Sequence, residues 1–517
     1  MKRARTAAKF GILSAATVAV LTVFWIAPAK ADDAENAFAK INHIVVIYGE
    51  NLSFDGIFGA YPDPDAEGLA KAKDAAPQTD HNGSVLAQLP PVRLKTKKEN
   101  GADIYLDKPL PNAPFDIDEH LEKGKATGDL VHRFYQEQEQ INGGKNDRFA
   151  AVSDAGGLAM GYFKDDSLRL WQLAHEFTLL DHFHHSAFGG SFLNHFWLIC
   201  ACTPEYKEAL VQKPEIACGI DGKGEPKLIP KLVICLDPAT GYLAHKDTKD
   251  GKPKSALEGA PEWVANAPVT PDGFAVNTLQ PPNPPFSDEP KLPSQSMPTI
   301  GDLLSKAGKT WAWYAGGWND AVEGKIEPYI GPLHFQPHHQ PFNYFANFAP
   351  GQPERSHLKD ESDFLAAIAE DKLPEVSFWK PAGRDTMHPG YTDLWTGDKR
   401  IGNIIDLIRA SPAWKDTAII ITFDENGGTW DHVAPPKRDR WGPGVRVPAL
   451  VISPYSRKGR IDHTVYDTTA IMKTIEVRFG LPALGPADAA SPDLRAAFDF
   501  SQLPQLTAAP ADTAPPN

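Results

Sequence analysis

Acidic and amide side chains closely follow two apolar stretches of the sequence. Glu50 and Asn51 come after the run IVVIY, and Asp424 and Glu425 come after the run AIIITF. Runs rich in β-branched residues are typical of strands that are buried on both faces. Ligands bind beyond the carboxyl ends of the strands in open α/β sheets, and carboxylate and amide oxygens are hard ligands for a cation. The two strand ends therefore predict a metal site, although the same residue types also cap helices and turns.

A serine lies between a glycine pair and an apolar helical run in the stretch SAFGGSFLNH, residues 186 to 195. The N–H groups and the dipole at the start of a helix favour an anion. Ser191 is therefore either an ordinary helix cap or a nucleophile whose target phosphorus lies over the helix end. Its surroundings do not match the G-x-S-x-G turn of α/β-hydrolases.

Histidines gather in loops that we expect at the same edge of the sheet: His338, His339, His388 and His432. Histidine supplies acid–base chemistry near neutral pH and donates hydrogen bonds to phosphate oxygens. A single loop histidine more often has a structural role, so it is the grouping of these histidines that favours a functional role. His132 lies in a stretch that we expect to be helical from residue 128 to 142, where a lone histidine is usually structural. The sequence has no HExxH, P-loop or GxGxxG pattern.

Strand-like and helix-like stretches alternate through most of the chain. We expect strands at 44–48, 177–180, 309–314, 375–379, 418–423 and 446–453, and helices at 166–176, 299–307, 361–371, 397–410 and 467–479. This order predicts an α/β fold with a mostly parallel central sheet that helices cover on both faces. Residues of about 203–298 are rich in Pro, Gly and Lys, and we expect them to form an insertion in this fold.

The first 31 residues have the pattern of a secretory signal peptide. A basic start precedes an apolar stretch from 11 to 27 and the cleavage pattern Ala29-Lys30-Ala31. The alternative is an uncleaved membrane anchor, but we expect no stable anchor. We therefore predict a periplasmic or secreted protein with a signal peptide at 1–31, one α/β domain at 32–485 and a C-terminal tail at 486–517 that is Pro/Ala-rich at its end.

The chain is acidic, with a formal net charge of −14 at pH 7 over 517 residues. Loss of the five basic residues of the signal segment changes this charge to about −19. A nucleic-acid-binding protein needs a basic face, so we expect no nucleic acid partner. An anionic small substrate stays compatible with this charge, because a metal and a few cationic groups invert the local field.

The four cysteines lie close together in the sequence, at Cys200, Cys202, Cys218 and Cys235. An even number of cysteines in an exported chain favours one or two disulfides in the insertion. Four cysteines allow three pairings, and the sequence does not choose between them. A zinc site built from the four thiolates is the alternative, although the C-x-C spacing argues against it.

Five motifs of this chain resemble the bacterial phosphoesterase family that contains secreted acid phosphatases and phospholipases C, within the alkaline-phosphatase-like superfamily. They are ENLSFDGIFG, GGSFLNH, QPHHQPF, MHPG and TFDENGGTWDHV. The first and last are the specific ones, and the resemblance extends from about residue 40 to about residue 485. It implies an alkaline-phosphatase-like fold and one divalent metal ion of unknown identity.

The resemblance also implies roles for single residues. It implies five metal ligands: Glu50, Asn51, Ser191, Asp424 and Glu425. Ser191 matches the nucleophile, and the histidines that match phosphoryl-oxygen ligands are His132, His339 and His388, one of which protonates the leaving group. Asn51 is expected to help stabilise charge on the phosphoryl oxygens. His338 and His432 are expected to support these residues from behind.

These roles predict a phosphoric ester hydrolase whose substrates are small phosphate esters, including phospholipid head groups as an alternative. In the family that these motifs resemble, the phospholipase branch favours threonine at the nucleophile position and often has additional C-terminal domains. Serine at position 191 and the short C-terminal tail favour an acid phosphatase that forms a phosphoserine intermediate.

The main alternative is a phospholipase C, which needs an apolar rim to accept lipid. Aromatic residues at 311–318 and 335–345 are candidates for such a rim, although aromatic clusters are more often core packing. Two further alternatives are an inactive phosphate-ester-binding protein and a sulfatase-like or phosphomutase enzyme of the same superfamily.

Overall fold

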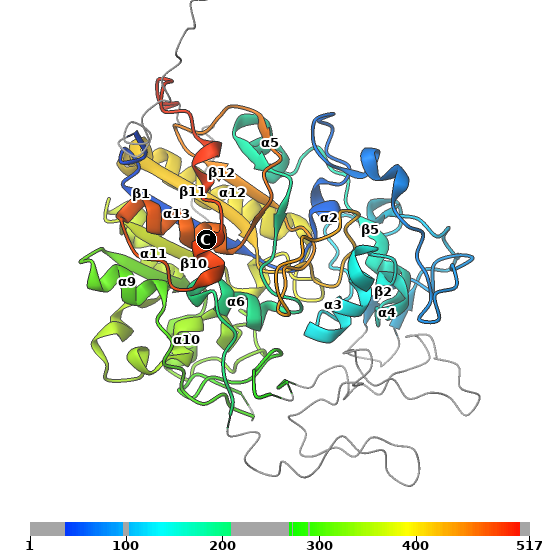
Figure 1. Cartoon of the computed structure of the whole chain (residues 1–517), viewed down its shortest axis with the longest axis horizontal. Helices are drawn as coiled ribbons and strands as arrows, with labels where there is room; N and C mark the ends of the chain where they lie inside the picture. Colours follow the sequence, from blue (N-terminus) through cyan, green and yellow to red (C-terminus); the bar gives the residue numbers. More distant parts are fainter. Residues whose placement is uncertain (1–36, 97–102, 208–267, 271, 288–289, 507–517) are drawn as a thin grey trace, which may run out of the picture.

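The structure is a computed structural model that describes residues 37–96, 103–207, 268–270, 272–287 and 290–506 (Figure 1). The predicted signal peptide, most of the predicted insertion and the end of the C-terminal tail lie outside these residues. Cys200 and Cys202 form a disulfide with each other. This bond removes both thiolates from the alternative of a four-cysteine zinc site, and Cys218 and Cys235 lie outside the described residues.

An eight-stranded sheet forms the centre of the molecule, in the order β13-β6-β12-β11-β1-β10-β8-β9. Every neighbouring pair is parallel except the two that β12 makes with β11 and β6. The predicted mostly parallel sheet is thereby confirmed. Its strands are β1 (His43–Gly49), β6 (Thr178–Leu180), β8 (Trp311–Ala315), β9 (Leu358–Asp360), β10 (Val376–Lys380), β11 (Thr417–Phe423), β12 (Ala449–Ile452) and β13 (Arg460–Asp462).

Strand β1 lies in the middle of the sheet, between β10 and β11. Val46 is paired with Phe378 on one side and with Ile420 on the other. Both β1 and β11 are buried along almost their whole length, as expected for β-branched runs covered on two faces. Because the three strands are parallel, their carboxyl ends meet at one edge of the sheet, where Glu50 and Asp424 follow.

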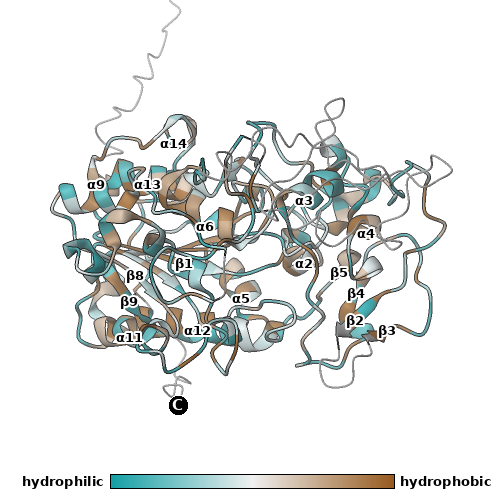
Figure 2. Cartoon of the chain, turned by 90° about the horizontal axis from the view of Figure 1, so that it is seen from below, coloured by the Kyte–Doolittle hydropathy of each residue, from teal (hydrophilic) through white to brown (hydrophobic). Residues whose placement is uncertain are grey.

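Helices cover both faces of the sheet (Figure 2). One layer contains α6 (Ser191–Cys200), α9 (Ile300–Lys306) and α13 (Thr469–Phe479), and the other contains α5 (Arg169–Glu176), α11 (Glu361–Ala369) and α12 (Leu394–Ala410). Short α10 (Trp318–Val322) follows β8. This arrangement confirms the predicted α/β architecture.

A group of short elements from the first third of the chain lies beside the sheet, at the right of Figure 1. It contains α2 (Phe54–Phe58), α3 (Phe134–Ile141), α4 (Phe149–Val152), β2 (Arg93–Thr96), β3 (Asp103–Tyr105), β4 (Phe115–Asp116) and β5 (Gly161–Tyr162). Two further short strands, β7 (Phe183–His184) and β14 (Tyr466–Asp467), pair with each other. Helix α2 begins directly after Asn51 and Ser53, so this group adjoins the carboxyl end of β1.

The helix expected from residue 128 begins only at Phe134, so the prediction that His132 lies on a helix is wrong. Tertiary contacts hold the preceding residues in an extended path. The N–H group of Val131 donates to Asp154 Oδ1 at 2.7 Å, and Asn277 Oδ1 accepts from the N–H group of Phe134 at 3.1 Å. These contacts outweigh local helix propensity and direct His132 toward the carboxyl end of β1.

The region after residue 485 adds to the core before it leaves the described part of the chain. Helix α14 (Pro486–Ala490) is followed by the buried residues Leu494, Ala497 and Phe498. The Phe498 ring lies 5.5 Å from the ring of Phe38, near the other end of the described chain. Among the described residues, no helix has both the length and the apolar character that a membrane crossing requires.

Two carboxyl groups meet where α13 packs on α14, and they give stability a pH dependence. Burial and the neighbouring Asp488 raise the pKa of Glu476 from 4.5 to about 8. The folded state therefore holds this proton more tightly than the unfolded state. The free energy of unfolding should fall as the pH rises from about 4.5 through about 8.

We predict that Glu476→Gln removes this decline, because glutamine has no proton to lose. The variant should unfold at the same temperature as the parent at about pH 4 and a few degrees higher at about pH 9. Differential scanning calorimetry at both pH values measures the two midpoints. Parallel pH profiles for the variant and the parent would contradict the assignment of this effect to Glu476.

Candidate active site

Ser191 is the first residue of α6, directly after Gly190. Its Oγ atom lies 3.3 Å from Asn51 Oδ1 and 3.4 Å from Glu425 Oε1. The structure thus brings the predicted nucleophile to the two predicted strand-end residues. Gly189 has a φ of +87°, and a Cβ atom there would lie 2.4 Å from the backbone nitrogen of Phe134, so only glycine fits this turn.

Buried side chains that the sequence analysis did not select hold this turn in place. Glu137 Oε2 accepts from the Gly189 N–H group, and Glu137 Oε1 lies 2.8 Å from His185 Nε2. Asn194 donates to the Ala187 carbonyl and accepts from the Ala187 N–H group, both at 2.9 Å. The sequence did indicate a role for Asn194, because this strongly polar residue lies in a mostly apolar helix.

The carboxylates that follow β1 and β11 are fully buried. Asp424 Oδ1 accepts from the N–H groups of Glu425 at 2.8 Å and Asn51 at 3.2 Å. Gly427 has a φ of +60°, and a Cβ atom there would lie 2.3 Å from the Asn51 carbonyl oxygen. A turn built on Gly427 and Gly428 therefore follows β11, and it allows two adjacent carboxylates to lie at the same place.

Lys380, at the end of β10, is fully buried between two of these carboxylates. Its Nζ atom lies 3.1 Å from Asp424 Oδ2 and 3.4 Å from Glu50 Oε2, and it donates to the Gly49 carbonyl at 3.0 Å. Sequence analysis missed this residue. The sequence did contain an indication of its role: a lysine stands at the end of an apolar strand, where a charged side chain is unusual.

The positive groups around Glu50 keep that side chain ionised. Burial alone raises the pKa of Glu50, but the charges of His339 and Lys380 outweigh burial and hold the pKa well below its usual range. His339 Nε2 and Gln336 Nε2 lie 3.1 and 3.2 Å from Glu50 Oε1. Glu50 Oε2 accepts no hydrogen bond from the described residues.

Glu425 shows that the negative charge is not balanced by these side chains. Burial and the adjacent Asp424 carboxylate raise the pKa of Glu425 well above its usual range. Three buried carboxylates face one lysine, and carboxylate, amide and hydroxyl oxygens are the ligands that hard divalent cations prefer. The residues present therefore fit a divalent cation, which would supply the missing positive charge.

His132 and His388 lie on either side of Asn51, with their Nε2 atoms 3.3 and 3.0 Å from Asn51 Nδ2. Their Nδ1 atoms lie 2.5 and 2.6 Å from the carbonyl oxygens of Leu130 and Pro389. A carbonyl oxygen only accepts, so each Nδ1 must carry the proton. In the neutral tautomer, such a ring presents Nε2 as an acceptor. Burial lowers the pKa of His132.

His339 and His338 lie behind Glu50, and burial lowers the pKa of each. His195, which sequence analysis did not select, stacks on His339 with ring centroids 5.4 Å apart. Its Nδ1 atom lies 2.7 Å from the Ser191 carbonyl oxygen and 4.0 Å from Asp424 Oδ2. The stack connects α6 to the loop that carries both predicted histidines.

The structure places His432 away from this group. Its Nδ1 atom lies 2.7 Å from Asp55 Oδ2, and Arg446 joins the same cluster through Asp55 and Asp431. Burial acts to lower the pKa of His432, but the hydrogen bond to Asp55 raises it overall. The contacts of His432 tie α2 to the loop after β11.

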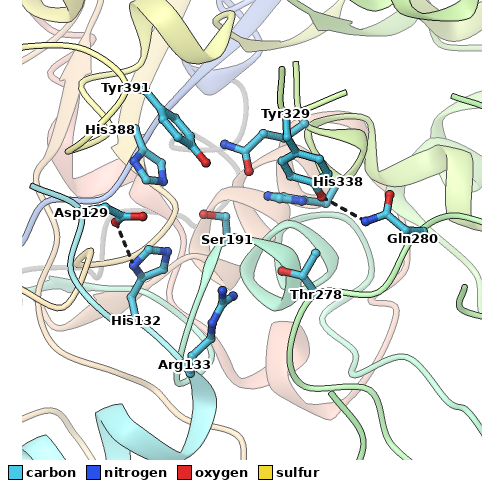
Figure 3. A pocket seen from close by; sticks show the side chains of 11 residues that line it. Asp129, His132, Arg133, Ser191, Thr278, Gln280, Tyr329, His338, His388 and Tyr391 are labelled. Atoms are coloured by element: carbon cyan, nitrogen blue, oxygen red, sulfur yellow. Dashed lines mark hydrogen bonds and ion pairs between the residues drawn. The ribbon is translucent and has the colours of Figure 1, made fainter. Parts of the chain in front are cut away.

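A pocket of about 310 Å³ opens above Ser191 (Figure 3). Its other lining residues are Asp129, His132, Arg133, Thr278, Gln280, Tyr329, Gln336, His338, His388 and Tyr391. Figure 3 shows the Ser191 hydroxyl directed toward the side of His132 and His388, with Arg133 below it, Tyr391 beside His388 and Tyr329 beside His338. Within the described residues the lining is polar or tyrosine, which suits a small anionic ligand.

Residues 41–482 match the Phosphoesterase family. The chain belongs to this family. It is 25% identical to phospholipase C B of Mycobacterium tuberculosis over 507 residues, covering 90% of this chain and 78% of that protein. It is 23% identical to the non-hemolytic phospholipase C of Pseudomonas aeruginosa over 508 residues, covering 89% of this chain and 57% of that protein.

A solved structure from Vibrio parahaemolyticus, described as a protein in the alkaline phosphatase superfamily, matches 71% of this chain and 73% of its own length, with 11% identity and a TM-score of 0.27. The family match confirms the resemblance that the five motifs indicated. The chain is a phosphoric ester hydrolase, and groups of side chains that could hold a metal ion are present in it.

We predict that Glu137→Gln lowers kcat by at least about tenfold with little change in KM, because Glu137 positions the turn before Ser191. Steady-state kinetics on a p-nitrophenyl ester measures both constants, and circular dichroism reports the fold. Glu139→Gln is the matched control, since Glu139 lies on the same helix but pairs with His81. Equal kcat values for both variants and the parent would show that Glu137 does not position the nucleophile.

Proposed function

We propose that this phosphoesterase is an exported, metal-dependent acid phosphatase that hydrolyses phosphomonoesters through a phosphoserine at Ser191. The observation that carries the proposal is the place of the Ser191 hydroxyl. It lies at the start of α6, beside Asn51 and Glu425, at the base of a polar pocket. Export rests on the predicted signal peptide.

One divalent cation would be held by the five ligands that the motifs imply: Glu50, Asn51, Ser191, Asp424 and Glu425. When bound, such an ion lowers the pKa of the serine hydroxyl and polarises a phosphoryl oxygen. The excess of buried carboxylates over buried lysine supports this assignment.

The reaction proposed for Ser191 is a double displacement. Ser191 Oγ passes its proton to solvent water and bonds to phosphorus as the bond from phosphorus to the ester oxygen breaks. The departing oxygen takes a proton from a protonated histidine and leaves as an alcohol. Water then attacks the phosphoserine, which releases phosphate and restores the serine hydroxyl. The N–H groups at the start of α6 favour the negative charge throughout.

The tautomers of His132 and His388 explain why acid would favour this reaction. A neutral ring whose Nδ1 donates to a carbonyl has no Nε2 proton for a phosphoryl oxygen. A protonated ring donates from both nitrogens. Burial lowers the pKa of His132, so this donation requires acid or the negative charge of a bound phosphomonoester.

The aromatic residues considered as a lipid-accepting rim support the phosphatase over the phospholipase. Trp313 and Phe342 are fully buried and pack against each other, and Trp311 lies with them in the core. They therefore present no apolar surface to a lipid. The second candidate is a phospholipase C. It is favoured by the similarity of this chain to phospholipases C of Mycobacterium tuberculosis and Pseudomonas aeruginosa.

We predict that Ser191→Ala lowers kcat by at least about a thousandfold while leaving the fold intact, because no other group forms the covalent intermediate. Acid-quenched parent enzyme should carry a phosphate on Ser191 that mass spectrometry detects. Ser167→Ala, at an exposed position, is the control. A Ser191 variant with near-full turnover would rule out the covalent mechanism.

Substrate choice is tested by turnover of p-nitrophenyl phosphate and of p-nitrophenylphosphorylcholine from about pH 4 to about pH 8, with and without a chelator. We expect monoester turnover that peaks at acid pH and is lost with the chelator. Preferential cleavage of the choline diester would favour the phospholipase C instead. Absence of turnover of both substrates would favour an inactive binding protein.

A further inference from the structure

A second group of side chains that could hold a metal lies at the same carboxyl edge of the sheet, toward its β13 end, and we call it the edge cluster: Asp181, His182 and His463. His182 Nδ1 lies 3.0 Å from Asp181 Oδ1. His463 Nδ1 lies 3.0 Å from both carboxylate oxygens of Asp181. None of the three residues lines the pocket above Ser191, and the phosphatase mechanism uses none of them.

Strand pairing brings these residues together. Asp181 and His182 directly follow β6, and His463 directly follows β13, which is the edge strand of the sheet. The two strands are parallel, with Leu180 paired to Asp462. Their carboxyl ends therefore point the same way and place one histidine from each strand on either side of a single carboxylate.

The spacing of the three ligand atoms suits a small divalent cation. All three lie within 4.8 Å of one another. Bonds of about 2.0–2.1 Å to a tetrahedral ion place neighbouring ligand atoms about 3.3 Å apart. Each histidine Nδ1 lies 3.0 Å from an Asp181 oxygen, close to that spacing. Two imidazole nitrogens with one carboxylate oxygen form a ligand set that Zn²⁺ binds well, with a fourth position left for water.

Access and support are also suitable. The Asp181 side chain is fully buried, while the side chains of His182 and His463 are 22% and 49% exposed, so an ion has a path from solvent. Asp181 Oδ2 accepts from the Glu67 N–H group at 2.9 Å, and the Asp181 carbonyl accepts from buried Arg446 at 2.9 Å. The central ligand is thus fixed before any ion arrives.

We propose that the edge cluster is a zinc site, separate from the catalytic metal, that fastens β13 to β6. The ion would also steady the pair of short strands that follow, because the N–H group of Tyr466 in β14 donates to the His182 carbonyl at 2.9 Å. The segment from β7 continues directly into the turn before Ser191.

The test is the zinc stoichiometry of the chelator-treated full chain, measured by isothermal titration calorimetry with Zn²⁺ alone. The parent should bind one more ion than the double variant His182→Ala/His463→Ala. His463→Gln, a milder change, should weaken that site by at least about tenfold. His120→Ala, at a histidine outside the cluster, should match the parent. Anomalous scattering at the zinc edge should show a peak between the three ligands.

Circular dichroism checks that each variant is folded, and turnover of p-nitrophenyl phosphate is followed separately, so failure of the proposed phosphatase activity would leave the zinc count interpretable. Equal zinc stoichiometry and affinity in the parent and in both cluster variants would overturn the proposal. So would a parent crystal soaked in Zn²⁺ that shows no anomalous peak at the edge cluster. The three residues would then form a hydrogen-bonded network only.

Discussion

The concentration of negative charge at the ends of β1 and β11 is the constraint on which the rest of the site depends. Glu50, Asp424 and Glu425 are fully buried and lie close together. Such a group of carboxylates is stable only with compensating positive charge. Lys380 supplies part of it from the neighbouring strand, and the N-terminus of α6 adds a partial positive charge. The remaining deficit supports the proposal that a cation binds here and, through that cation, a phosphate group.

Much of this arrangement could be predicted because short stretches of the sequence contain the patterns that determine it. Buried parallel strands appear as apolar runs, so β1, β10 and β11 were predicted within about two residues of their observed bounds. The carboxyl ends of such strands meet by necessity, which is why Glu50 and Asp424 could be placed together. Ser191 could be placed at a helix start from the glycine pair before it.

The residues that escaped prediction act through contacts between distant parts of the chain. In the sequence, Lys380 is only the residue at the end of a strand. Its contacts with the carboxylates become visible only when β1 and β11 are placed in the same sheet. Glu137 looks like a surface position on a polar helix, yet it is buried and holds the turn before Ser191. His132 was expected in a helix, because local propensity carries no information about Asp154 or Asn277. His432 belongs to the motif that contains Asp424 and Glu425, but its contact with Asp55 holds its side chain away from them.

The central position of β1 also sets the order of events during synthesis. Gly49 and Lys380, which touch in the finished sheet, are 331 residues apart in the chain, and β11 follows later still. The first strand within the described residues therefore gains both neighbours only late in synthesis. No assembled cluster of carboxylates exists on a nascent or unfolded chain, so hydrolysis cannot begin before the C-terminal third has been made. If these carboxylates hold the proposed metal, the enzyme becomes active only late in its own synthesis.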